Sequence, residues 1–141
     1  MNATPMLAGA GPSTARPIDE ERGIEAIYAT GHWLLSDARS ADGASVFRAM
    51  ALLAPTDERS WLGLGACHEA LGQPDLALKM YATGRALARR SVRCDLARVR
   101  LLRAADRDDE AEAILELAAE AAETLDDETL IALVLAERRV R

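Results

Sequence analysis

Aromatic and β-branched residues are scarce in this chain of 141 residues. It contains one Phe, two Tyr and two Trp, although half of its residues are apolar. Ala and Leu, which have the highest helix propensities, supply most of that apolar content. The shortage of good strand formers argues against a sheet-rich fold and favours an all-α domain.

Cysteine is also rare, and neither residue belongs to a recognisable site. Cys67 and Cys94 lie inside helical patterns, which is typical of a protein from a reducing compartment. Together with His32 and His68 they form no C-x-x-C or H-x-x-x-H spacing, so no metal site is predicted. We expect the cysteines in the core and the histidines in a groove or on the surface. Nucleotide-binding loops and nucleophile motifs are missing as well, so the sequence predicts neither an enzyme nor a cofactor.

The chain lacks a secretory leader and any run of eighteen apolar residues. These features predict a cytoplasmic protein without stable membrane insertion. Residues 1–17 mix Pro, Gly, Ala and Ser without a period and are expected to form a disordered tail. Residues 18–141 are expected to form a single domain.

A basic excess is absent too, because the formal net charge is -6, which argues against a nucleic-acid partner. Seven arginines nevertheless gather between residues 85 and 103, ahead of eleven acids in residues 106–128. The arginines alternate faces of a helix, which favours intramolecular pairing or a solvated face. Recognition of a ligand by Arg93 and Arg100 is the next interpretation, and Glu69 is a candidate partner for Arg93 across repeats.

The most informative stretch runs from Trp61 to Tyr81 and reads W-L-G-L-G-A-C-H-E-A-L-G-Q-P-D-L-A-L-K-M-Y. Its two apolar periods are separated by Gly72 and Pro74, which predicts a hairpin of two helices. Small residues at Gly65 and Ala77 would let the helices approach closely around Tyr81. The core stripe is predicted to contain Trp61, Leu64, Tyr81 and Leu87.

A similar helical period precedes this hairpin. An apolar stripe begins near Ile18, a turn is expected at residues 40–43, and a second stripe runs to Leu52 and Leu53. Thr56 or Asp57 is predicted to cap the helix that contains Trp61.

A step of 34 residues connects these patterns: it separates Gly31 from Gly65, Phe47 from Tyr81 and Leu53 from Leu87. This is the period of tetratricopeptide (TPR) repeats, whose helical hairpins stack into a right-handed superhelix. We predict three hairpins, at residues 24–57, 58–91 and 92–125, and a C-terminal capping helix at 126–139. Ala38 and Asp106 stand where the middle repeat has its turn glycine.

Residues 46–81, and above all the run L-G-L-G-A-C followed by G-Q-P-D-L-A, go beyond the general repeat pattern. This segment resembles the class II chaperones of bacterial type III secretion, the SycD/LcrH group that serves translocator proteins. The resemblance extends over about residues 24–90. It implies a concave groove that holds a short cargo segment, with Tyr28, Leu62 and Ala66 as pocket walls.

The TPR pattern itself places the first helix of each repeat along this groove. Counting from it gives the candidate groove residues Tyr28, His32, Leu35, Arg59, Leu62, Ala66, Glu69, Arg93, Leu96 and Arg100. They describe a mostly apolar trough with a basic end, which suits an extended peptide with apolar anchors.

The resemblance implies a chaperone that keeps hydrophobic translocator proteins soluble and competent for secretion. Two alternatives remain open: a chaperone for the needle subunit of the same apparatus, or a generic TPR scaffold or regulator. Apolar surface at the open end of the first repeat also favours homodimerisation.

Overall fold

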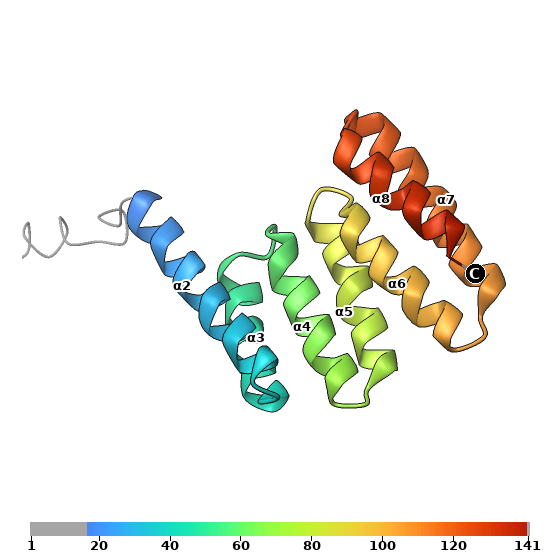
Figure 1. Cartoon of the computed structure of the whole chain (residues 1–141). Helices are drawn as coiled ribbons and strands as arrows, with labels where there is room; N and C mark the ends of the chain where they lie inside the picture. Colours follow the sequence, from blue (N-terminus) through green and yellow to red (C-terminus); the bar gives the residue numbers. More distant parts are fainter. Residues whose placement is uncertain (1–16, 141) are drawn as a thin grey trace, which may run out of the picture.

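The computed structural model describes residues 17–140, which form seven helices and no strand. The helices follow one another in a row (Figure 1), and their bounds are α2 (Pro17–Ser36), α3 (Ser40–Leu53), α4 (Glu58–Ala70), α5 (Pro74–Leu87), α6 (Val92–Ala104), α7 (Asp108–Leu125) and α8 (Glu128–Arg139). Consecutive helices α2/α3, α4/α5 and α6/α7 pack as hairpins, and α2, α4, α6 and α8 contact one another in sequence. The predicted class, an all-α stack of TPR-type hairpins closed by a capping helix, is confirmed. The tail expected at residues 1–17 lies outside the described residues except for Pro17.

The turns inside the hairpins share one backbone conformation. Ala38, Gly72 and Asp106, which are 34 residues apart, all adopt positive φ, at 60°, 72° and 58°. This left-handed conformation is natural for glycine and costs other residues about 1 kcal/mol. The first turn therefore lies just before Ser40, and the prediction of a turn at residues 40–43 is wrong because those residues already begin α3.

Side-chain caps begin three of the helices. Asp57 accepts a hydrogen bond from the Arg59 backbone N–H, and this confirms one of the two predicted caps of α4. Ser91 and Asp127 do the same for Cys94 and Leu130 at the starts of α6 and α8. Each cap satisfies a backbone donor that the helix itself leaves free.

Glycine allows close packing of the central hairpin. A Cβ added at Gly65 would overlap the Tyr81 ring, and Ala77 is fully buried beside it. The predicted close approach of α4 and α5 around Tyr81 is confirmed. Cys67 and Cys94 are buried free thiols in the neighbouring core clusters, as expected.

Three leucines predicted in the apolar stripes are exposed. Leu52, Leu53 and Leu87 expose 82%, 66% and 46% of their surface. They occupy the last turns of α3 and α5, beyond the part of each helix that the neighbouring hairpin covers. Leu87 is therefore not a core residue, whereas Leu64 and Tyr81 are, and Trp61 is half-buried between two core clusters.

Ion pairs within the chain account for most of the arginine run. The buried Asp95 carboxylate lies 2.6 Å from Arg85 and 3.3 Å from Arg98. Arg103 lies 3.1 Å from Glu137 of α8. The suggested pairing of Glu69 with Arg93 is wrong, because Arg93 instead contacts Glu58 at 3.1 Å.

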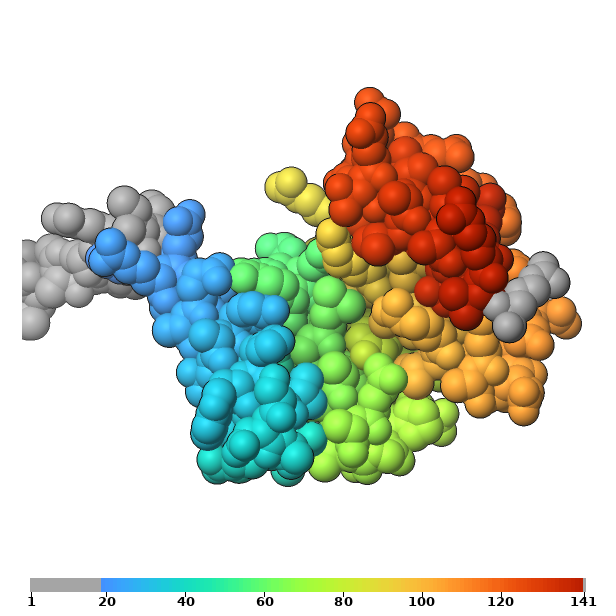
Figure 2. All heavy atoms as spheres, in the orientation of Figure 1, coloured from blue at the N-terminus to red at the C-terminus, as the bar shows by residue number. Residues whose placement is uncertain are grey.

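Helix α8 occupies the position that the first helix of a fourth repeat would have. Leu130 and Val134, which are 34 residues after Leu96 and Arg100, lie in the core cluster that also contains Leu96. In Figures 1 and 2, α8 lies over the α6 end of the array. Between residues 17 and 140, no helix is both long and apolar enough to cross a membrane.

Candidate functional site

The candidate groove lies on the side formed by the first helices of the hairpins. Figure 1 views the array with α2, α4 and α6 in front of α3, α5 and α7. The 34-residue step aligns Tyr28 of α2 with Leu62 of α4, and His32 with Ala66. Two columns of side chains therefore run across the helices and provide a surface for an elongated ligand.

A hollow of about 200 Å³ lies between α2 and α4 at these columns. Six candidate groove residues line it, namely Tyr28, His32, Leu35, Arg59, Leu62 and Ala66. Most of this lining is apolar, and the volume suits one apolar side chain rather than a whole small-molecule ligand. The structure thus brings together the candidates from the first two repeats.

The floor of this hollow comes from Phe47 of α3, a residue that the groove prediction missed. The fully buried Phe47 ring lies between Gly31 and Gly63, and a Cβ at Gly31 would be only 2.9 Å from it. At Gly63, a Cβ would overlap the ring. The two glycines on the groove helices therefore allow a residue of the second helix to reach the groove floor.

Arg59 closes one side of the hollow. Its guanidinium donates to both carboxylate oxygens of Glu25, at 2.8 and 3.1 Å, and to both oxygens of Asp57, at 2.9 and 3.1 Å. Its Cζ atom lies 4.6 Å from the centre of the Tyr28 ring, within cation–π distance. The contacts hold the tyrosine in place as a pocket wall.

These contacts also change the acidity of the two carboxyl groups. The hydrogen bond from Arg59 lowers the pKa of Asp57 and also that of Glu25, against the opposing effect of desolvation. Both carboxylates therefore stay charged, and the Arg59 pKa is raised in return.

The remaining candidates lie outside the hollow. Glu69 accepts a hydrogen bond from the Tyr81 hydroxyl, and burial raises the pKa of Tyr81. Arg93 is held by Glu58, whereas Arg100 exposes 61% of its side chain and lies 3.8 Å from Glu137. Arg100 is thus the candidate with a cationic group most available to a ligand.

Leu96 does not offer groove surface. It exposes only 3% of its area, because Leu130 and Val134 of α8 pack in the same cluster. The repeat pattern places Leu96 on the groove side of α6 correctly in phase with Leu62, but the capping helix covers it. The open part of the groove is therefore formed mainly by α2 and α4.

The two histidines differ in their surroundings. His32 is exposed and lines the hollow, whereas His68 is buried and its Nδ1 lies 2.7 Å from Gln73 Oε1 in the turn before α5. The expectation of a groove or surface position is therefore wrong for His68. Across residues 17–140, no group of three or more His, Cys, Asp and Glu side chains is arranged to hold a metal ion.

Helical hairpins at a 34-residue step, with an apolar hollow across their first helices, define a TPR-type array with a candidate peptide groove. Known proteins narrow this class. The chain is 38% identical over 61 residues to the low calcium response locus protein H of Yersinia pestis, a match that spans 43% of this chain and 36% of that protein. The matched segment is thus about a third of the length of the curated relative. No family model matches the chain.

Solved structures extend the similarity to most of the fold. The type III secretion translocator chaperone SycD of Yersinia enterocolitica superposes with a TM-score of 0.71 and 29% identity, over 82% of this chain and 87% of SycD. PcrH, from Pseudomonas aeruginosa, in complex with the chaperone-binding region of PopB gives 0.69 and 28%, over 83% and 95% of the two chains. The resemblance to class II translocator chaperones is confirmed in sequence and in structure.

Proposed function

We propose that this protein is a chaperone for the translocator proteins of a type III secretion system, and that it binds an extended cargo segment in the α2/α4 groove. The observation that carries the proposal is the apolar hollow over Phe47, in a fold shared with PcrH bound to the chaperone-binding region of PopB. The groove residues proposed to contact cargo are the six that line the hollow, together with Glu69, Arg93 and Arg100.

The physical role follows from the chemistry of such cargo. A protein that later enters a membrane carries long apolar segments, which aggregate in water unless they are covered. A groove that covers one segment through apolar contacts prevents this without making or breaking a covalent bond. We accordingly place the protein in the cytoplasm, where the cargo is synthesised, and assign it no catalytic role or cofactor.

Residues 18–141 are proposed to act as one unit, with repeats at 24–57, 58–91 and 92–125 and a cap at 126–139. The supporting observation is that ion pairs and hydrogen bonds join each pair of adjacent repeats. Arg59 reaches back to Glu25, Arg93 to Glu58, and Arg103 forward to Glu137 of the cap.

We also propose that the open end of the first repeat forms a homodimer. A shallow, mostly apolar hollow there is lined by Ala26, Ile27, Thr30, Ser45, Val46 and Ala49. One repeat later, the residues equivalent to Ala26 and Thr30 are Ser60 and Leu64, which the preceding hairpin buries. A second copy would cover the face that lacks such a hairpin. Sedimentation velocity on wild type and Ile27→Glu tests this, and a wild-type monomer at all concentrations would exclude the dimer.

Coexpression with the apolar secretion substrates of the same gene cluster tests the chaperone function. We expect the substrate to be insoluble alone and to copurify with this protein when both are produced. A substrate that stays insoluble, or is soluble without the partner, would contradict the proposal. Solubility also distinguishes the scaffold alternative, because the partner of a scaffold would not depend on it.

A further inference from the structure

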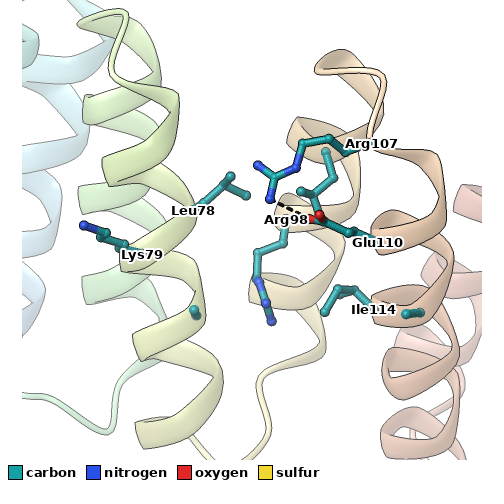
Figure 3. Close-up of a pocket in the computed structure, with 9 residues that line it drawn as sticks. Leu78, Lys79, Arg98, Arg107, Glu110 and Ile114 are labelled. Atoms are coloured by element: carbon teal, nitrogen blue, oxygen red, sulfur yellow. Dashed lines mark hydrogen bonds and ion pairs between the residues drawn. The ribbon is translucent and has the colours of Figure 1, made fainter.

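A second pocket lies on the opposite side of the array from the groove. It has a volume of about 400 Å³ and lies between α5 and α7, above α6 (Figure 3). Arg98 and Leu102 of α6 line it, and they follow Leu96 by two and six residues. At 100° per residue, this places them about 200° and 240° around the helix from the groove side. A ligand here would not compete for space with a peptide in the groove.

The base of the pocket is apolar. Leu78 of α5 and Ile114 of α7 point toward the space between the helices in Figure 3, and both pack on the C-terminal core cluster. Leu102 belongs to that cluster, and Ala82 and Ala113 leave room above it. An apolar side chain entering here would therefore extend the existing core and remove its own surface from water.

The rim is basic, although the chain as a whole has a net charge of -6. Arg107 is neutralised by Glu110 at 2.5 Å. Arg98, however, shares the single Asp95 carboxylate with Arg85. Lys79, for its part, makes no ion pair with any residue between 17 and 140. The rim thus retains an excess of positive charge, and the acids Asp108 and Asp109 at the start of α7 do not line it.

The polar groups also restrict the backbone of an occupant. Lys79, Arg98 and Arg107 are donors only, and Glu110, the acceptor on the rim, is used by Arg107. An extended strand would bury N–H groups that find no acceptor here. A helix satisfies its own backbone and can still present carboxylates to the cations.

We propose that this pocket between α5 and α7 docks an amphipathic helix of a protein partner, with a large apolar side chain between Leu78 and Ile114 and flanking carboxylates at Lys79 and Arg98. The charge complementarity of the rim selects an acidic helix over a basic one. The proposal goes beyond the cargo groove and does not depend on what the groove binds.

Two synthetic amphipathic helices test the proposal with the full chain. One has a leucine stripe flanked by glutamates, and in the other lysines replace the glutamates. We expect fluorescence anisotropy to detect binding of the glutamate peptide and much weaker binding of the lysine peptide. Amide chemical-shift changes should centre on Leu78, Ala82 and Ile114. Lys79→Glu should weaken the glutamate peptide by about threefold, the effect of one exposed ion pair.

Blocking variants make the test specific. Ala113→Trp fills the pocket from an exposed position and should abolish binding, and Ala113→Glu provides a second variant should the tryptophan impair folding. Matched changes on α3, Ala41→Trp and Arg48→Glu, are exposed and should leave the affinity unchanged. Equal binding of the two peptides, or binding that survives both changes at Ala113, would overturn the proposal. Binding lost only in the groove variant Ala66→Trp would place the peptide in the groove and overturn it as well.

Discussion

Arg59 of α4 is hydrogen bonded to Glu25 of α2, the residue 34 positions earlier, through two contacts of 2.8 and 3.1 Å. The same guanidinium binds Asp57 and lies over the Tyr28 ring. One side chain therefore connects the first two repeats and also fixes a wall of the groove. Stability and groove shape are coupled at this position.

Arg59→Ala should reduce stability at neutral pH and flatten its dependence on acid. Because Arg59 lowers the folded-state pKa of Asp57 and Glu25, their contribution is complete above the unfolded pKa values of about 4. It is lost as pH falls through the lower folded-state values. We expect the Arg59–Asp57 pair to contribute about 1 kcal/mol, since it is only partly buried.

Chemical denaturation between pH 7 and pH 2 measures this effect. Arg39→Ala is the matched control, because it breaks an exposed pair with Asp42 at 2.8 Å that should contribute almost nothing. Parallel stability curves for wild type and Arg59→Ala across the acid range would contradict the assigned role.

Gly65→Ala should destabilise the central hairpin. The new Cβ would overlap the buried Tyr81 ring, and overpacking of this kind costs about 1–3 kcal/mol. Gly23→Ala is the control, because no atom lies within 4 Å of a Cβ there and helix propensity alone should stabilise α2 by about 1 kcal/mol. Thermal unfolding should therefore move in opposite directions for the two variants. An unchanged melting temperature for Gly65→Ala would contradict the packing.

The two thiols should be unreactive in the folded protein. Burial raises the pKa of Cys94 to about 11 and also raises that of Cys67. A pKa of that size leaves about a hundredfold less thiolate near pH 8 than an ordinary cysteine has. A thiol reagent should label both residues only in denaturant, and fast labelling of the native protein would contradict their burial.

The basic end of the groove predicts a difference between two arginines. Arg100→Ala should weaken cargo binding by about two- to fivefold, because its exposed guanidinium is 3.8 Å from its nearest carboxylate. Arg93→Ala should have a smaller effect, since Glu58 holds Arg93 at 3.1 Å. Isothermal titration with a cargo segment compares the variants, and unchanged affinity for Arg100→Ala would remove it from the groove.

The repeat step explains why much of the fold could be predicted from the sequence. The distance from Gly31 to Gly65 identified the hairpins, and it also aligned Tyr28 with Leu62 on the groove side. The phase of each first helix is a local property, so counting was sufficient there.

Residues whose positions depend on distant packing could not be found in this way. Phe47 reaches the groove floor from α3 because Gly31 and Gly63 leave room, and the two glycines were the available signal. Leu96 has the phase of a groove residue, but α8 covers it, and a repeat pattern does not show which helix packs over another. Leu87 has a core-like phase and lies beyond the covered part of its helix.

The central claim is that the hollow over Phe47 binds the translocator segment. The most direct measurement is the affinity of a purified cargo segment for wild type, for Ala66→Trp, which fills the hollow, and for Ala41→Trp, an exposed change on α3. We predict that wild type and Ala41→Trp bind equally and that Ala66→Trp, although folded, does not bind. Equal binding by all three proteins would contradict the claim.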